Sequence, residues 1–318
     1  MKRMLVSIGI GIGIGSSSSS GAGGLARPNG IDARAVGFGG AFAALADDAS
    51  AVYFDPAALS FVEQEVSVGG ELVFGPRSYT PTNGAAQDAT IVAPVPTGGV
   101  VVRFLDHDRP SRLTLAVGAF NTFGGKVTFP KTGMPALDNT EDAAFELDAG
   151  AALRVSDKLS VGATLRLGIG LFALDATQMP FDAHLSASGL GVALATGAVL
   201  TPTESLRIAV VYRSPLRIAT TGDGTLVLPA GPTQAQVEHD QTWPQQASLG
   251  VGWLAAPRVR VAAQLDWTEW STIHQLAVTF PGNGAAHAWD ATGRVLRCDA
   301  SSLGYRIAVE FDPLYAAA

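Results

Sequence analysis

Apolar and polar residues alternate strictly between residues 159 and 171. Every second position is apolar, and the positions between carry small or polar side chains, with Arg166 near the middle of the polar set. Successive side chains of a β-strand point to opposite faces, so this period of two predicts a strand with one apolar and one polar face. Strands of this kind build outer-membrane β-barrels, whose walls face lipid outside and water inside.

The same alternation recurs beyond residue 62. It occurs in residues 66–74, 100–104, 113–119, 145–155, 190–200, 206–212, 249–253, 259–267 and 303–311. Together these segments predict an all-β fold with about ten antiparallel transmembrane strands. Their polar positions mix arginine, carboxylates, glycine and small residues, which is typical of a barrel lumen and unlike the lysine- and glutamate-rich outer face of a soluble sandwich.

The connections between these segments alternate in length. Short ones are expected at residues 156–157, 201–204 and 256–257, and long ones at residues 75–90, 124–142, 173–184 and 220–241. This alternation predicts periplasmic turns at one end and extracellular loops at the other. Tyr212, Trp253, Trp267 and Trp270 fall near strand ends and fit interfacial aromatic girdles, with ordinary core packing as the alternative.

The last predicted strand, residues 303–311, runs into Asp312 and Pro313 shortly before the sequence ends at Ala318. A barrel must pair its last strand with its first, because each unsatisfied backbone group in hydrocarbon costs several kcal/mol. We therefore expect the barrel to be incomplete at its C-terminus, with further strands or a partner closing it.

Two segments precede the strands. Residues 1–22 begin with Lys2 and Arg3, continue with an apolar stretch and end in small residues, which predicts a signal peptide, with a flexible tail as the alternative. Residues 23–62 are rich in small and aromatic residues and predict a partly helical hatch inside the lumen. Residues 63–318 are then expected to form the barrel.

Composition and charge narrow the class further. The chain is 47% hydrophobic and 15% charged, yet its apolar runs are shorter than the about 20 residues that a membrane helix needs. The net charge of -7 argues against a nucleic-acid partner, which requires a basic face. Cys298 is the single cysteine, and such low thiol content suits an oxidising compartment. We expect a monomer surrounded by outer-membrane lipid.

The hatch segment also carries a family resemblance. Gly-Phe-Gly-Gly-Ala-Phe at residues 37–42, Ala-Asp-Asp-Ala-Ser-Ala-Val-Tyr-Phe at residues 46–54 and Asp-Pro-Ala-Ala-Leu at residues 55–59 resemble the N-terminal signature of the FadL/TodX-like outer-membrane transporters of hydrophobic compounds. Residues 243–250 and 265–271 resemble later strands of that family. The resemblance implies a barrel of about fourteen strands with a hatch inside it.

The resemblance implies a function in the outer membrane of a Gram-negative bacterium. We expect transport of hydrophobic compounds, with long-chain fatty acids as the first substrate class and aromatic hydrocarbons as the alternative. Burial of each methylene is worth about 0.8 kcal/mol, so an apolar groove binds such a ligand easily and release is the harder step. A hatch that rearranges and a strand that opens sideways into the membrane would provide release.

Both elements have candidate residues. The hatch pocket is assigned to Phe38, Phe42, Leu45, Phe54, Asp55, Pro56 and Leu59, with simple packing of the hatch against the wall as the alternative. The kinked strand of the lateral opening is assigned by resemblance to Phe120, Asn121, Phe123, Gly124 and Gly125, with an ordinary loop entrance as the alternative. The family has Asn-Pro-Ala where this chain has Asp55-Pro56-Ala57, which adds a carboxyl group to the lumen and weakens the case for anionic substrates.

Two other functions fit the sequence less well. A lipid-acting outer-membrane enzyme needs a Ser/His pair, but the histidines at 107, 184, 239, 274 and 287 lie apart in expected turns and loops, without the spacing of a metal cluster and without a Gly-x-Ser-x-Gly motif. A passive porin is disfavoured by the aromatic hatch. We therefore expect no enzymatic activity, no catalytic residues, no cofactor and no metal site.

Overall fold

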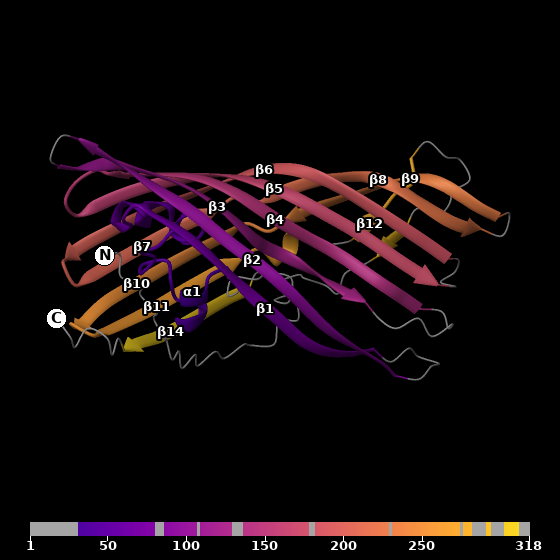
Figure 1. Ribbon diagram of the computed structural model, residues 1–318, viewed down its shortest axis with the longest axis horizontal. Helices are drawn as coiled ribbons and strands as arrows, with labels where there is room; N and C mark the ends of the chain where they lie inside the picture. The colour runs from indigo at the N-terminus through magenta and orange to yellow at the C-terminus, as the bar shows by residue number, and fades with distance from the viewer. Residues whose placement is uncertain are drawn as a thin grey trace.

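A computed structural model describes residues 31–79, 86–106, 109–128, 136–177, 182–228, 231–273, 276–281, 291–293 and 302–311. The predicted signal peptide lies outside these residues. One antiparallel sheet of 12 strands dominates the fold (Figure 1). Its strands are β1 (Glu65–Tyr79), β2 (Gln87–Asp106), β3 (Arg109–Thr128), β4 (Ala136–Arg154), β5 (Leu159–Thr177), β6 (Asp182–Thr203), β7 (Leu206–Arg213), β8 (Leu216–Leu228), β9 (Gly231–Trp243), β10 (Gln246–Ala256), β11 (Val259–Thr268) and β14 (Ser302–Phe311).

The main path of the sheet is β1-β2-β3-β4-β5-β6-β7-β10-β11-β14, and β8 and β9 form a hairpin that extends it. The first half of β6 pairs with β8 and the second half with β7. Strand β8 therefore continues β7 after a break at Ser214 and Pro215, and β10 continues β9 after a break at Pro244 and Gln245. Proline has no N–H to donate to a ladder. The prediction of about ten long antiparallel strands is confirmed.

The sheet curves but does not close. Strand β1 pairs with β2, and β14 pairs with β11 in a regular register from Val259↔Phe311 to Thr268↔Ser302. No pairing joins β1 to β14 within the described ranges. Within the described residues the sheet is therefore open.

Burial along the strands confirms which face is apolar. On β5, Val161 and Leu165 are 37% and 52% exposed, whereas Thr164 and Arg166 are 0% and 1% exposed. Large exposed apolar residues occur on strand after strand: Val66, Val68, Leu72, Val100, Val102, Leu113, Leu115, Val117, Leu147, Leu153, Leu190, Val192, Leu194, Val210, Leu249, Val251, Trp253 and Leu265. A continuous apolar outer surface around polar buried residues is the arrangement of a lipid-facing barrel wall.

The long loops expected from the sequence are wrong in their extent. Strand β3 continues to Thr128 and β4 begins at Ala136, while residues 229–230 alone separate β8 from β9. The outward side chains of β8 include Arg217, Thr221 and Asp223, so this hairpin extends the wall above the apolar band. Because the outer face of β8 is mostly polar, with Val227 as an exception, this hairpin lacks the membrane pattern although it keeps the strand period.

The aromatic girdle prediction holds in part. Tyr212 and Trp253 are 42% and 49% exposed on the outer surface, as expected for interfacial residues. The prediction for Trp270 is wrong, because its side chain is 2% exposed and lies in the 3-10 helix η2 (Trp270–Thr272), within a buried apolar cluster. The sequence pattern gave no indication that the chain turns inward after β11.

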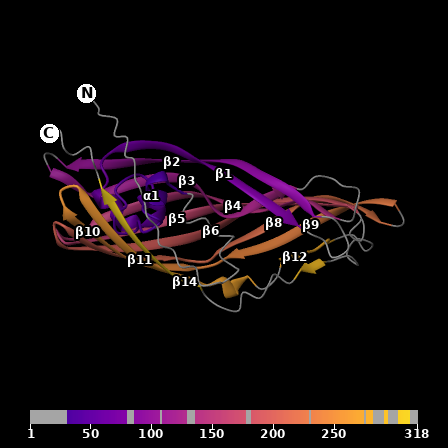
Figure 2. The same cartoon turned by 90° about the horizontal axis from the view of Figure 1, so that it is seen from below.

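The described part of the predicted hatch, residues 31–62, lies within the curve of the sheet near one end (Figures 1 and 2). It contains α1 (Ala33–Gly37), α2 (Ala51–Phe54) and the 3-10 helix η1 (Pro56–Phe61). Asp32 caps α1 by accepting from the backbone N–H of Arg34 at 2.8 Å. Two short strands, β12 (Leu276–Val278) and β13 (Ala291–Gly293), form a separate pair near the other end. No described helix is long and apolar enough to cross a membrane.

Candidate transport site

The aromatic residues assigned to the hatch pocket pack against one another. The rings of Phe38 and Phe42 are 5.7 Å apart, and those of Phe42 and Phe54 meet edge to face at 5.4 Å. All the apolar residues of this assignment are at most 9% exposed and belong to one buried core: Phe38, Phe42, Leu45, Phe54 and Leu59. The structure thus brings the predicted residues together in the hatch interior, where edge-to-face pairs add to the apolar burial.

A glycine pair in the wall receives the turn at Asp55 and Pro56. Gly162 of β5 and Gly197 of β6 are register partners. A Cβ at Gly162 would overlap the backbone of Pro56, and one at Gly197 would overlap the Asp55 carboxyl. These two positions therefore have to be glycine for the hatch to reach the wall. The alternation predicted them as inward-facing, but not their role as a hatch contact.

Asp55 is fully buried in this contact. Its Oδ1 accepts a hydrogen bond from the N–H of Ala57 at 2.9 Å and so caps η1. Within the part of the chain that the structure describes, Oδ2 has no hydrogen-bond partner. Burial raises the pKa of the Asp55 carboxyl to about 7, against the weaker opposing effect of the backbone N–H groups of Ala57 and Ala58. The extra carboxyl in the lumen is therefore close to half protonated at neutral pH.

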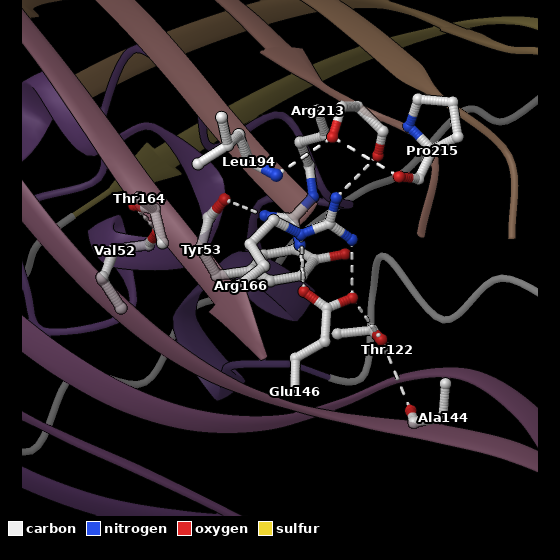
Figure 3. A network of polar contacts seen from close by, with 11 residues as sticks. Val52, Tyr53, Thr122, Ala144, Glu146, Thr164, Arg166, Leu194, Arg213 and Pro215 are labelled. Atoms are coloured by element: carbon white, nitrogen blue, oxygen red, sulfur yellow. Dashed lines mark hydrogen bonds and ion pairs between the residues drawn. The ribbon is translucent and has the colours of Figure 1, made fainter. Parts of the chain in front are cut away.

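A buried charge network joins the hatch to the wall (Figure 3). Glu146 of β4 accepts from the Arg166 Nε on β5 and from Arg213 on β7, each at 2.7 Å. Thr122 of β3 donates to the same carboxylate at 2.7 Å. Arg213 also donates to the Tyr53 carbonyl oxygen at 2.7 Å, with its guanidinium 3.7 Å from the centre of the Tyr53 ring. The Glu146 carboxylate thus connects four strands, β3, β4, β5 and β7, and one of the arginines that it binds also contacts α2.

A second carboxylate lies beside this network. Asp148 is 2% exposed, and neither of its oxygens has a hydrogen-bond partner among the described residues. The network therefore contains two carboxyl groups, of Glu146 and Asp148, and two guanidinium groups, of Arg166 and Arg213. Arg166 stood out in the sequence as the centre of a polar face. Its partners depend on the register between strands, which a single sequence does not reveal.

The predicted kink in β3 coincides with a bulge. Asn121 pairs with Phe145 and Phe123 pairs with Ala144 on β4, so Thr122 is an extra residue in the ladder. Gly124 follows with φ of 80°, and a Cβ there would overlap the carbonyl oxygen of Asp142. A residue with a side chain is strained in this conformation, so glycine is required where the strand bends.

The wall parts next to this bulge. Pairs between β2 and β3 run from Asp106↔Arg109 to Gly98↔Ala119 and end there. Beyond that point the described residues 87–97 pair with β1, and residues 120–128 pair with β4. Figure 1 shows the β1–β2 hairpin diverging from β3 and β4. Along this stretch β2 and β3 are neighbours with no ladder pairing between them among the described residues.

Large apolar side chains fill the interior at the same level. Phe123 of the kinked strand stacks on Trp243 with ring centres 5.0 Å apart, and each of the two residues is 1% exposed. They share a cluster with Leu216, Ile218, Trp270 and Ile273. A further apolar cluster, which includes Phe172, Leu185, Leu226 and Val237, lies on β5, β6, β8 and β9. The inner side of the kinked part of β3 is therefore apolar.

The chain after β11 folds back onto β9 near this second cluster. Thr279 bridges Glu238 through two backbone hydrogen bonds of 2.9 Å, and the His239 Nδ1 lies 2.8 Å from the Ala277 carbonyl oxygen. His239 stacks on Phe172 at 4.3 Å, and its Nε2 lies 3.9 Å from the Asp142 carboxylate beside the bulge. Burial lowers the pKa of His239, but Asp142 and the Ala277 carbonyl outweigh it, so the pKa is raised overall.

The placement of the histidines corrects one sequence expectation. His184 lies in β6 and His239 in β9, not in turns or loops. The other three histidines lie outside the described residues. Among the residues that are described, no three His, Cys, Asp or Glu side chains form a group suited to a metal ion. The Asp47–Asp48 pair serves ion pairs and a turn, since Asp47 pairs with Arg34 and Asp48 accepts from the Ser50 N–H at 3.0 Å.

Solved structures share this architecture. A FadL homologue from Pseudomonas aeruginosa has a TM-score of 0.67 at 17% identity, covering 90% of this chain and 77% of that one. The toluene transporter TbuX from Ralstonia pickettii scores 0.70 at 16% identity, covering 90% and 83%. The toluene transporter TodX from Pseudomonas putida scores 0.68 at 14% identity, covering 91% and 81%. At these identities the likeness establishes the fold.

The sequence itself establishes the family. Residues 15–294 match the profile of the family described as outer membrane protein transport protein (OMPP1/FadL/TodX). No curated protein gives a significant sequence match. The family consists of transport proteins, so the expectation that this chain is not an enzyme is confirmed, as is its place in the outer membrane. The chain belongs to the OMPP1/FadL/TodX family of outer-membrane transport proteins.

Proposed function

We propose that this protein takes up hydrophobic compounds across the outer membrane and releases them sideways through the opening between β2 and β3. Solved structures with this fold include transporters of toluene and a monoaromatic hydrocarbon channel. The observation that carries the proposal is the end of the β2–β3 ladder at Gly98↔Ala119, beside the bulge at Thr122 and the stacked pair Phe123 and Trp243. A ligand leaving there passes from apolar side chains to lipid without crossing water.

Uncharged compounds are the substrate class that the charges favour. Arg166 and Arg213 both bind Glu146, and Asp148 adds a second acid beside them. A carboxylate ligand would have to displace Glu146 and accept a neighbouring Asp148, at a considerable electrostatic cost in this dry interior. An aromatic hydrocarbon needs apolar contact alone, which the cluster around Phe123 supplies.

Long-chain fatty acids, the class expected first from the sequence, stay as the second candidate. The observation in their favour is the pair of buried guanidinium groups, Arg166 and Arg213, within the lumen. In this alternative the hatch core around Phe38, Phe42 and Phe54 opens as the acyl chain enters, and Arg213 exchanges its contact with the Tyr53 carbonyl for the ligand. The assignment of the hatch pocket and of the kink residues to the transport path is part of the same proposal.

The opening is tested by removing the bulge. Deletion of Thr122 brings β3 and β4 into one register, and we expect uptake of a radiolabelled monoaromatic hydrocarbon by whole cells to fall at least tenfold. The matched control is Val117→Ala, on the outer face of the same strand and 54% exposed. A small sugar serves as the solute for nonspecific leakage. Unchanged hydrocarbon uptake in the deletion variant, with the protein present at normal level in the membrane, contradicts the proposal.

Substrate class is tested in the same assay. Hydrocarbon and hexadecanoic acid are compared in the wild-type protein and in Asp148→Asn, which removes one acid while keeping its shape. The uncharged-substrate proposal expects hydrocarbon uptake to exceed acid uptake in the wild type, and acid uptake to rise in the variant. Saturable uptake of the acid alone assigns the second candidate.

A further inference from the structure

A cavity of about 220 Å³ lies between the hatch and two short turns of the wall, β6–β7 and β10–β11. The Leu254 N–H donates a hydrogen bond to the Ser205 carbonyl oxygen at 2.8 Å and so joins the two turns. Glu204 and Pro257 line the cavity and are exposed, so it is open to solvent at the turns. Short turns mark the periplasmic end of such barrels, and the cavity therefore opens toward the periplasm.

The register of three strands places basic side chains on the hatch side of the wall. Arg207 of β7 lies opposite Gly252 of β10, and Arg260 of β11 lies opposite Leu254 of β10. Gly252 and Leu254 are two residues apart on one strand, so these four positions share one face of the sheet. That face is turned toward the hatch, because a Cβ at Gly252 would overlap the Leu45 side chain. The cavity therefore lies inside the wall.

The charged groups of the cavity do not balance. Its lining carries three guanidinium groups and two carboxylates, those of Arg207, Arg258, Arg260, Asp47 and Glu204. Asp47 is engaged by ion pairs with Arg34 of the hatch and, at 3.2 Å, with Arg260. Arg207 and Arg258 then remain against Glu204 alone, which leaves an excess of one positive charge. A ligand with a single negative charge matches this excess.

Arg207 and Arg258 have N–H groups available for such a ligand. Among the residues that the structure describes, neither guanidinium forms a hydrogen bond or an ion pair. The Arg207 guanidinium lies 4.1 Å from the centre of the Phe61 ring, and the Arg154 guanidinium lies 5.5 Å from the same centre. An anion in the cavity offsets the repulsion between these like charges. A guanidinium also presents its donors as a planar fork that matches the two oxygens of a carboxylate.

Apolar side chains form much of the remaining lining. Leu45, Leu254 and Pro257 belong to it, and Leu254 is 42% exposed although its position faces the hatch. Contact with the apolar part of a ligand would remove this surface from water. A phosphate ester carries about 1.5 to 2 negative charges at pH 7, more than the cavity balances, whereas a carboxylate carries one. The lining therefore suits an apolar body with one carboxylate.

We propose that this cavity binds a small organic monocarboxylate from the periplasm. The carboxylate accepts hydrogen bonds from Arg207 and Arg258, and the apolar body lies against Leu45 and Leu254. The ligand is thereby held beside the ion pair of Asp47 and Arg260, which joins the hatch to β11. This site is separate from the proposed transport path and does not depend on which compounds the protein transports.

The proposal is tested by isothermal titration calorimetry of the purified full chain in detergent, with benzoate as the probe. We expect saturable binding of benzoate at one site. Inorganic phosphate, which lacks the apolar body, and benzyl alcohol, which lacks the charge, are each expected to bind at least about tenfold more weakly. The double variant Arg207→Gln and Arg258→Gln removes both guanidinium forks and should weaken benzoate binding at least about tenfold.

Two control variants keep the outcome decisive. Arg217→Gln removes an arginine that is paired with Asp240 on the outer hairpin, where both partners are exposed, and should leave benzoate binding unchanged. The double variant Arg207→Lys and Arg258→Lys keeps both charges and is expected to retain part of the binding, which separates loss of the ligand contacts from misfolding. Absence of saturable benzoate binding by the wild type, or unchanged binding in the Gln variant, overturns the proposal. Phosphate or benzyl alcohol binding as tightly as benzoate overturns the carboxylate assignment.

Discussion

The two halves of the interior are packed by opposite means. Around the hatch, small wall residues such as Gly162 and Gly197 let the hatch backbone come close, and buried charges such as Glu146 and Arg213 bind it. Toward the outer end, large side chains such as Phe172, Trp243 and Leu226 project inward, and most of the ion pairs of the described residues there are partly or largely exposed. The wall around the hatch is complementary in shape and charge to one partner, the hatch. The outer half presents apolar side chains that are not matched to one particular partner.

This difference suggests a division of tasks. Changes in the hatch half should cost stability, because close packing and buried ion pairs tolerate neither added volume nor a missing partner. Changes in the outer half should alter uptake more than stability, because apolar residues there are exchangeable with others of similar volume. Four predictions test this comparison.

The largest effect is expected from Glu146→Leu. The substitution leaves Arg166 and Arg213 buried without their carboxylate, and breaking a buried ion pair typically costs about 3–5 kcal/mol. The free energy of unfolding, measured by urea titration in detergent, is expected to fall by this amount. Glu141→Gln is the matched control, since its pair with Lys126 is partly exposed and such pairs contribute about 0–1 kcal/mol. Equal losses for both variants would contradict the role given to the network.

The next effect is expected from Gly162→Val. The added side chain meets the backbone of Pro56, and overpacking of this kind costs about 1–3 kcal/mol. We expect the hatch to become accessible to added protease while the strands stay resistant. Ala163→Val, one residue along on the exposed face of β5, is the control and should leave the hatch protected. A protected hatch in both variants would show that the close contact between Gly162 and the Pro56 backbone is not needed to hold the hatch.

Asp55 predicts a dependence on pH. Its pKa of about 7 lies above the ordinary value of 3.8, so the protonated form is favoured in the folded state. The stabilisation is complete below the ordinary pKa and is lost as the pH rises through about 7. Between pH 6 and pH 8 the loss amounts to about 1.4 kcal/mol for one group. Asp55→Asn keeps a side-chain oxygen that can cap η1, and it should abolish the pH dependence of the protection of the hatch against added protease. If the variant shows the same pH dependence as the wild type, another group causes it.

The smallest effect is expected at the outer end. Burial lowers the pKa of His239, but Asp142, the Ala277 carbonyl and Asp240 raise it by more. The protonated ring is therefore favoured in the folded state. This contribution is present below the ordinary pKa of 6.5 and is lost as the pH rises through the folded-state value. The protection factors of the Ala277 and Thr279 amides, which are corrected for the intrinsic rise of exchange with pH, should therefore fall on alkalinisation. His239→Gln should remove that response and leave exchange in the hatch unchanged.

How far the sequence predicts the molecule differs between wall and site. The period of two along β5 predicted both the strand and its faces, because alternation is a local property of the chain. The extent of the β8–β9 hairpin was missed, because above the membrane the outer face no longer has to be apolar. The kink at Phe123 and Gly124 was found by resemblance, whereas the bulge residue Thr122 and the end of the β2–β3 ladder required the register.

The site shows the same limit. Arg166 was recognisable as an arginine on a polar face, but its bond to Glu146 depends on how β4 and β5 align over many residues. The contact of Gly162 and Gly197 with the hatch involves two strands and a hatch turn that is distant in the sequence. Interactions between residues far apart in the chain follow from tertiary register, and a single sequence carries no direct record of that register.

The paired breaks at Pro215 and Pro244 have a consequence for how this protein can be engineered. Leu216 pairs with Trp243 just above them and Arg213 pairs with Gln246 just below, so both strands are interrupted at one height. The Ser214 side chain accepts from the Leu194 N–H at 3.0 Å and holds the junction to β6. The hairpin beyond the prolines thus begins at a defined height, and on one side its strand β8 pairs with the first half of β6. Grafting a different hairpin at this junction should change what the cell surface displays without disturbing the strands anchored in lipid.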